Sequence, residues 1–108
     1  MALPVITRQP SSVVVKVYGT GSFICTARSY GVVTLTWKKL NSELPVITNI
    51  TVSRSLNEIT STLRLESVGY YKGYYYCVLE NSAGKVNSTF AHFDIISKHL
   101  CCEIFMSI

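Results

Sequence analysis

The sequence predicts an all-β fold, either a sandwich or a barrel of short strands. Apolar and polar residues alternate with a period of two along most of the chain. Turn-forming residues separate these segments at intervals of about ten residues, and no segment shows a convincing helical period. With 108 residues, the chain is long enough for one continuous core and too short for two.

The first half of the chain contains three alternating segments. Residues 13–17, 22–28 and 33–38 each carry apolar side chains on one parity and polar side chains on the other. Glycines at positions 19, 21 and 31 mark the turns between them. A weaker stretch at 46–54 is rich in β-branched residues, and we expect one or two short edge strands there.

The second half repeats the pattern. Segments 59–66 and 73–79 alternate clearly, and a turn containing Gly84 follows the second of them. The last strand is expected to run to about Ile95. Its inward parity changes between Ser88 and Ala91, which requires a β-bulge near Thr89 and Phe90.

The charged residues argue against several classes of function. The net charge of +4 comes from scattered basic residues that form no stripe, so no nucleic-acid partner is expected. Six acidic residues and two isolated histidines, without a glycine-rich phosphate loop, give no catalytic constellation and no small-molecule substrate site. The cysteines lack metal-ligand spacing, so we predict no metal and no cofactor.

The sequence leaves two possibilities for the cellular location. The first residues lack the basic and apolar regions of a signal peptide, and no apolar run approaches the roughly 20 residues that span a bilayer. We expect either an intracellular protein or a piece of a larger secreted or membrane protein.

One set of residues is much more specific. Cys25 lies twelve residues before Trp37, and Trp37 lies forty before Cys77, all on inward parity. Three short motifs accompany them: Leu63-x-Leu65, Gly73-x-Tyr75-x-Cys77 and Asn81-x-x-Gly84. Together they resemble the signatures of immunoglobulin domains of the intermediate type, which occur in cell-adhesion proteins, receptors and giant muscle proteins. The resemblance covers about residues 4–95.

The resemblance implies a Greek-key sandwich of two antiparallel sheets, with a disulfide between Cys25 and Cys77 and with Trp37 packed over it. It also implies that Leu65 belongs to the core and that the Tyr75 hydroxyl bonds to backbone in the preceding loop. In muscle versions of the fold the two cysteines stay reduced, and that alternative remains open. One position departs from the family, because Tyr71 stands where an aspartate is usual.

We expect two parts in the chain, an immunoglobulin-like domain at 1–95 and a disordered tail at 96–108. Cys101 and Cys102 lie in the tail, and the sequence gives them no role.

The resemblance implies a non-catalytic module for protein recognition or cell adhesion, part of a larger extracellular or cell-surface protein. Its partner would be a protein, with homophilic pairing as one option. The alternative is an intracellular structural domain of the muscle type. The oxidation state of Cys25 and Cys77 separates the two interpretations.

A partner surface and two modification sites are also predicted. The outward parity of two neighbouring strands carries tyrosines and apolar residues of the kind found at interface centres. The partner-face candidates are Thr36, Lys38, Tyr74, Tyr76 and Val78. The sequons Asn49-Ile50-Thr51 and Asn87-Ser88-Thr89 make Asn49 and Asn87 candidates for glycosylation.

Overall fold

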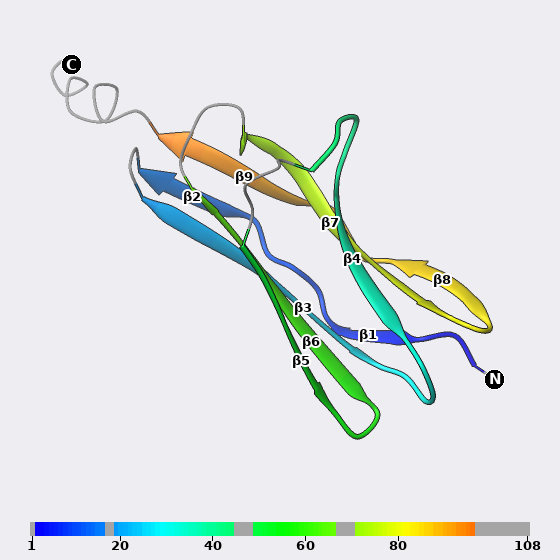
Figure 1. Cartoon of the computed structure of the whole chain (residues 1–108). Coiled ribbons are helices and arrows are strands. Elements are labelled where there is room, and N and C mark those ends of the chain that lie inside the picture. The colour runs from blue at the N-terminus through cyan, green and yellow to red at the C-terminus, as the bar shows by residue number, and fades with distance from the viewer. Residues whose placement is uncertain (1, 17–18, 45–48, 67–70, 97–108) are drawn as a thin grey trace, which may run out of the picture.

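The computed structural model describes residues 2–16, 19–44, 49–66 and 71–96. The described residues form two packed layers of strands and no α-helix (Figure 1). The strands are β1 (Val5–Arg8), β2 (Val13–Lys16), β3 (Thr20–Arg28), β4 (Thr34–Lys39), β5 (Asn49–Ser55), β6 (Glu58–Glu66), β7 (Gly73–Asn81), β8 (Gly84–Asn87) and β9 (Ala91–Ile96). One sheet has the order β1-β3-β6-β5, and the other has the order β2-β9-β7-β4 with β8 also paired to β7.

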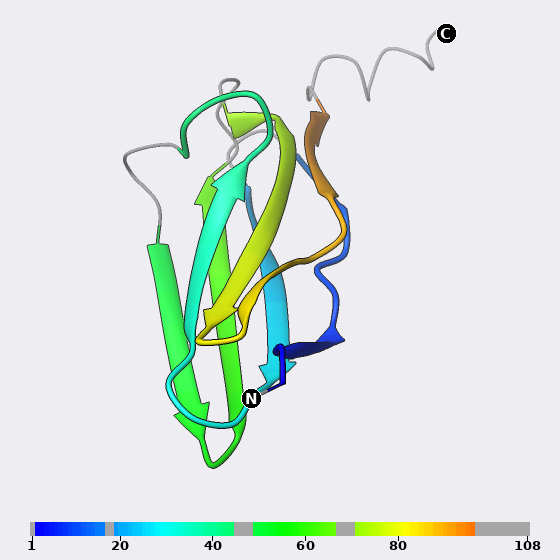
Figure 2. The same cartoon turned by 90° about the vertical axis from the view of Figure 1, so that its right-hand side faces the viewer.

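The predicted all-β sandwich is confirmed, with one pairing that the expectation of antiparallel sheets did not include. β2 pairs with β9 in parallel, with Val13 opposite Phe93 and Lys16 opposite Ile96. β1 pairs with β3, so the chain crosses from one sheet to the other between β1 and β2 (Figure 2). Pro10 lies in this crossing, and a residue without a backbone N–H suits a position where a strand ends its ladder.

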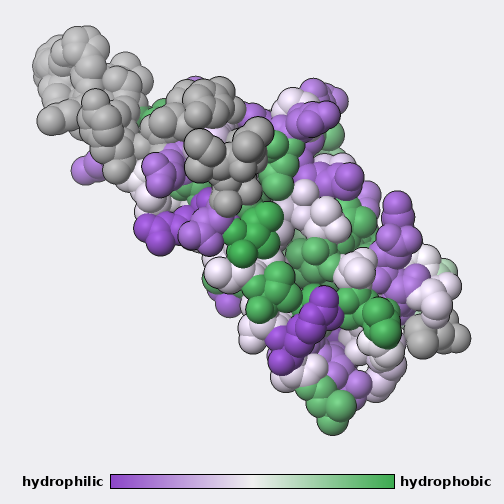
Figure 3. All heavy atoms as spheres, viewed as in Figure 1, coloured by the Kyte–Doolittle hydropathy of each residue, from purple (hydrophilic) through white to green (hydrophobic). Residues whose placement is uncertain are grey.

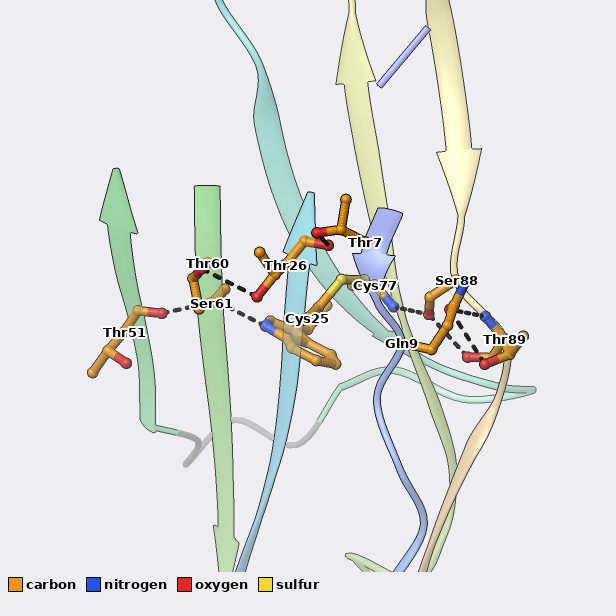
Figure 4. Close-up of a disulfide and its surroundings, with 11 residues drawn as sticks. Thr7, Gln9, Cys25, Thr26, Thr51, Thr60, Ser61, Cys77, Ser88 and Thr89 are labelled. Carbon is orange, nitrogen blue, oxygen red and sulfur yellow. Dashed lines mark hydrogen bonds between the residues drawn. A yellow bond between two sulfur atoms is a disulfide. The ribbon is translucent and has the colours of Figure 1, made fainter. Parts of the chain in front are cut away.

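The core lies between the sheets and is built around aromatic rings and one disulfide. Cys25 of β3 and Cys77 of β7 form a disulfide that joins the two sheets (Figure 4). The Phe23 ring lies 6.3 Å from the Trp37 ring and 5.5 Å from the Tyr75 ring, measured between centroids. All of these side chains are buried, because the period-two alternation places them on the inner face of their strands.

Trp37 is the point at which β4 is tied to the opposite sheet. Its indole Nε1–H donates to Ser61 Oγ at 2.9 Å, and the Ser61 hydroxyl donates to the Thr51 carbonyl at 2.8 Å. Ser61 is fully buried, so this pair of bonds satisfies two polar groups that would otherwise be desolvated without a partner. Figure 4 shows Ser61 between Thr51 and the disulfide. Further along the same strand, Leu65 is 1% exposed.

Tyr75 connects β7 to the segment before it. Its hydroxyl donates to the Tyr71 carbonyl at 2.6 Å, and its side chain is fully buried. Tyr71, where the family usually has an aspartate, is itself buried at 3% exposure and belongs to the core. An aromatic ring thus fills this site in place of a charged side chain.

The bulge in the last strand lies between β8 and β9. Tyr75 pairs with Ala91, and Val78 pairs with Asn87. The chain therefore advances by three residues along β7 and by four residues along the segment from β8 to β9, which has one extra residue. Ser88 fills the gap: its N–H donates to the Cys77 carbonyl and its Oγ accepts from the Cys77 N–H, each at 2.9 Å. The predicted change of parity between Ser88 and Ala91 is confirmed, as an interruption that splits the strand in two.

The last strand ends at Ile96, one residue beyond the expected boundary at 95. The rest of the predicted tail, with Cys101 and Cys102, lies outside the described residues. The weak stretch at 46–54 overlaps β5, an edge strand that ends one residue later at Ser55. Residues 45–48 before it also lie outside the described part of the chain.

Candidate protein-recognition surface

The outward side of β4, β7 and β9 carries the aromatic side chains that the sequence placed on a partner surface. We call this surface the aromatic face and define it by these exposed or half-buried residues: Thr36, Lys38, Tyr74, Tyr76, Phe90 and His92. β7 lies between β4 and β9, so its outward tyrosines have neighbours on both sides. Lys38 is directly opposite Tyr76 in the pairing of β4 with β7.

Two ring pairs organise the aromatic face. Tyr74 stacks on His92 with centroids 4.5 Å apart and planes 23° from parallel. Tyr76 meets Phe90 edge to face, with centroids 5.3 Å apart. Tyr74 is 47% exposed and Phe90 is 55% exposed, so each pair presents one ring to solvent. Rings held in this way contribute contact area with little loss of rotamer freedom on binding.

Val78, predicted as part of the partner surface, must be removed from it, because it is only 9% exposed. It points outward, yet its strand is central at this position. Val78 is opposite Thr36 of β4 on one side and Asn87 of β8 on the other. The side chains of neighbouring strands therefore cover a short valine, whereas the longer tyrosines of the same parity extend past their neighbours.

The two sequons occupy different sheets. Asn87 is exposed at the end of β8, beside the aromatic face, and Asn49 is exposed at the start of β5. In the sequon of Asn87, Gln9 Oε1 accepts from the Thr89 N–H at 2.9 Å and lies 3.3 Å from the Thr89 hydroxyl. A glycan on Asn87 would shield the β8 side of the aromatic face.

An ion pair borders the face. Lys72 Nζ lies 3.4 Å from Asp94 Oδ1, and both side chains are partly exposed. The Ile95 backbone N–H donates to the same carboxyl group at 2.8 Å and is the main reason that the pKa of Asp94 falls below its usual value, with a smaller contribution from Lys72. Both contacts favour the ionised carboxyl group, and the edge of the face is charged.

The described residues contain neither a cluster of metal ligands nor a membrane-spanning helix. Within them, no group of three or more histidine, cysteine or acidic side chains lies close enough to hold a metal ion. An open hollow of about 450 Å³ is lined by Val32, Thr34, Glu80, Asn81 and Ser82, which include one titratable side chain. No helix in the described part of the chain is long and apolar enough to cross a membrane.

The partner-face candidates predicted from the sequence did not include His92 or Phe90. The alternation in the sequence could have placed His92 on the outward side, because its neighbours Ala91 and Phe93 both have inward parity. What the sequence could not supply was the pairing of Tyr74 with His92 across β7 and β9. Phe90 lies in the interruption between two strands, where alternation gives no direction.

The chain matches the model of a protein family. The family model described as immunoglobulin domain matches residues 4–81. No curated protein matches the chain.

Solved structures resemble the chain over most of its length. The I-band fragment I67–I69 from titin is 28% identical, with a TM-score of 0.72 over 90% of this chain and 34% of the other. The N-terminal Ig1-2 module of the Drosophila receptor protein tyrosine phosphatase DLAR is 31% identical, with a TM-score of 0.72 over 89% of this chain and 50% of the other. The chain therefore spans a third and a half of those two structures. A mutant complex of titin M10 with obscurin-like 1 matches at 19% identity and a TM-score of 0.70, over 89% of this chain and 95% of the other, which shows the fold alone.

Proposed function

Because this chain belongs to the immunoglobulin domain family, we propose that it is a non-catalytic module for protein recognition or cell adhesion, of the intermediate type, within a larger extracellular protein. The aromatic face is the observation that carries this proposal. Its two ring pairs expose aromatic area at the centre of a rigid sheet, and exposed aromatic residues are enriched where binding energy concentrates. The partner is a protein, because the face is broad and a small ligand would need an enclosed cavity.

Two features support the extracellular part of the proposal. The disulfide between Cys25 and Cys77 is of the kind that persists in oxidising compartments. Asn49 and Asn87 are both exposed on strands, so a glycan on either would point into solvent. We propose that both asparagines are glycosylated. The structural likeness to DLAR, a receptor, is consistent with a place at the cell surface.

A second candidate function is an intracellular structural domain, and the likeness to the titin fragment favours it. The two interpretations differ in cysteine chemistry. For the extracellular interpretation, the intact mass of protein from its native source should be measured without reductant. That mass should be lower by two hydrogen atoms than the mass of the protein with both Cys25 and Cys77 as thiols. Free thiols at both positions in that protein would reject the extracellular interpretation.

The role of the aromatic face is testable by substitution. The chain is first assayed against a panel of purified extracellular protein domains. For any protein that binds, Tyr74→Ser with Tyr76→Ser should weaken binding by about 2 kcal/mol or more, roughly thirtyfold in Kd, because both exposed ring pairs are lost.

The matched control is Tyr30→Ser, since Tyr30 is an exposed tyrosine, at 62%, outside the aromatic face. It should leave binding unchanged. Circular dichroism and a thermal melt confirm that each variant is folded. Binding that survives the double substitution in a folded protein removes the aromatic face from the proposal.

A further inference from the structure

β5 differs from every other described strand in its exposure. All seven of its residues, Asn49–Ser55, are exposed. It is the last strand of its sheet, paired to β6 on one side, and Figure 2 shows it along the outer margin of the molecule. The backbone N–H and C=O groups on its outer side have no strand to bond to among the described residues. Such an edge is a template for a further strand.

The inward side of β5 is also uncovered. Ile50 and Val52 are opposite Leu63 and Ser61, which are buried, so they share the parity of the core. They are nevertheless 42% and 48% exposed. Among the described strands, β4 is the last strand of the opposite sheet on this side. Figure 3 shows apolar side chains gathered along this open side of the sandwich, between β5 and β4.

The edge has little of the usual protection against pairing. Proteins commonly protect an edge strand with proline, with inward-pointing charges or with a bulge. β5 contains no proline, and its register with β6 runs without a break. Arg54 is its one charged residue; it shares the inward parity of Ile50 and Val52, but it lies next to the end of the strand. The Arg54 Nη1 donates to the Val33 carbonyl at 2.9 Å, which holds the guanidinium away from the centre of the strand.

We propose that β5 is a self-association edge, which pairs antiparallel with β5 of a second copy about a two-fold axis at Val52. In this register Val52 is opposite its own copy, Thr51 is opposite Ser53, Ile50 is opposite Arg54 and Asn49 is opposite Ser55. The two β1-β3-β6-β5 sheets then form one continuous sheet. A two-fold interface requires a surface that complements itself, and this strand meets that requirement.

The self-complementarity follows from the side chains. On the inward side, Ile50 and Val52 of both copies form one apolar cluster, and the stem of each Arg54 lies over the Ile50 of the other copy. On the outward side the hydroxyls of Thr51 and Ser53 are opposite each other. No like charges meet, because the one charged side chain of the strand faces an isoleucine. A second copy therefore fits this edge better than an unrelated strand carrying a charge at the centre.

The contact is small, since a seven-residue strand spans about 23 Å and such an edge buries less than the roughly 1,200 Å² of a stable complex. The dimer is therefore reversible and depends on concentration. The dimer does not depend on the aromatic face, because β5 and that face lie on different sheets.

The register is tested by disulfide trapping. The background carries Cys101→Ser and Cys102→Ser, so that no other unpaired cysteine remains, and Asn49→Gln, so that no glycan stands at the end of the strand. Val52→Cys should cross-link to its own copy at least about tenfold faster than a control thiol, because docking raises the effective concentration of the two thiols.

Two controls match this variant. Ile50→Cys has a similar exposure on the same side of the same strand, but the register places it opposite Arg54 and not opposite itself. Leu56→Cys is the second control, since Leu56 is 89% exposed just beyond the strand. Equal cross-linking rates at positions 50, 52 and 56 overturn the proposal.

Sedimentation equilibrium provides the second measurement, on the same background without a new cysteine. The mean mass should rise with concentration, and Val52→Lys should abolish the rise by placing two ammonium groups opposite each other. Val14→Lys, at a residue 59% exposed in the other sheet, should leave the rise in mean mass unchanged.

A mean mass that stays monomeric up to about 1 mM overturns the proposal, as does a rise in mass that Val52→Lys leaves intact. Tyr74→Ser with Tyr76→Ser should affect neither measurement, so failure here is distinguishable from failure of the aromatic face.

Discussion

At the scale of single residues, Tyr75 combines several interactions of the core. Its hydroxyl donates to the Tyr71 carbonyl, its ring packs against Phe23, and Lys39 Nζ lies 5.6 Å from its ring centre. Burial, together with the nearby Tyr71 phenol, raises the pKa of Tyr75 to about 12. The hydroxyl therefore stays protonated and keeps its donor over the whole physiological range.

Tyr75→Phe should lower the free energy of unfolding by about 1–3 kcal/mol at pH 7, because the Tyr71 carbonyl loses its donor in a buried site. The folded pKa of Tyr75 lies above the ordinary value of 10.0, so its contribution is complete below pH 10 and is lost as the pH rises through 12. Urea denaturation from pH 7 to 12 should show the difference from wild type shrinking in that window. Tyr30→Phe, at an exposed tyrosine, should track wild type, and a difference that is constant with pH would contradict the account.

The residue scale also shows what could be predicted from the sequence about the site. The motifs around Cys25, Trp37 and Cys77 predicted the disulfide and the buried indole. The contact of Trp37 with Ser61 could not be predicted, since it joins strands whose lateral order the sequence does not state. Val78 was misplaced for the same reason: alternation gives the direction of a side chain, but its exposure depends on the neighbouring strands.

At the scale of strands, alternation and turn residues predicted the main segments well. Alternation and turn residues could not predict the parallel pairing of β2 with β9, because it joins residues about eighty positions apart and no local turn encodes it. Gly21 marks where this strand pair meets the opposite sheet. A Cβ added there would lie 2.9 Å from Phe93 Cε1 and 3.0 Å from Val15 Cγ1.

Gly21→Ala should therefore destabilise the domain by about 1–3 kcal/mol, as expected for overpacking between two sheets. The matched control is Ser22→Ala, one residue along β3 and on its exposed side. Urea midpoints of the two variants provide the measurement. Equal midpoints would mean that β2 and β9 shift away from β3 without cost.

At the scale of the whole molecule, the disulfide joins the two sheets across 52 residues of chain. A cross-link of that span restricts the unfolded chain and stabilises the fold by about 4 kcal/mol. Cys25→Val with Cys77→Val should lower the free energy of unfolding by about that amount. Reductant should lower the urea midpoint of the wild-type domain and leave that of the double variant unchanged. An unchanged wild-type midpoint in reductant would show that the bond contributes little to stability.

The parallel pairing of β2 with β9 has a mechanical consequence. The two strands lie side by side and run toward the same end of the molecule (Figure 1). When Val13, at the start of β2, and Ile96, at the end of β9, are pulled apart, the force acts along the strand axes. It pulls β2 toward one end of the pair and β9 toward the other, so the two strands are loaded in shear. All four register pairs from Val13–Phe93 to Lys16–Ile96 carry the load together, whereas a hairpin such as β7 with β8 opens one pair at a time. Tension applied between these two points is therefore resisted in shear by all four pairs.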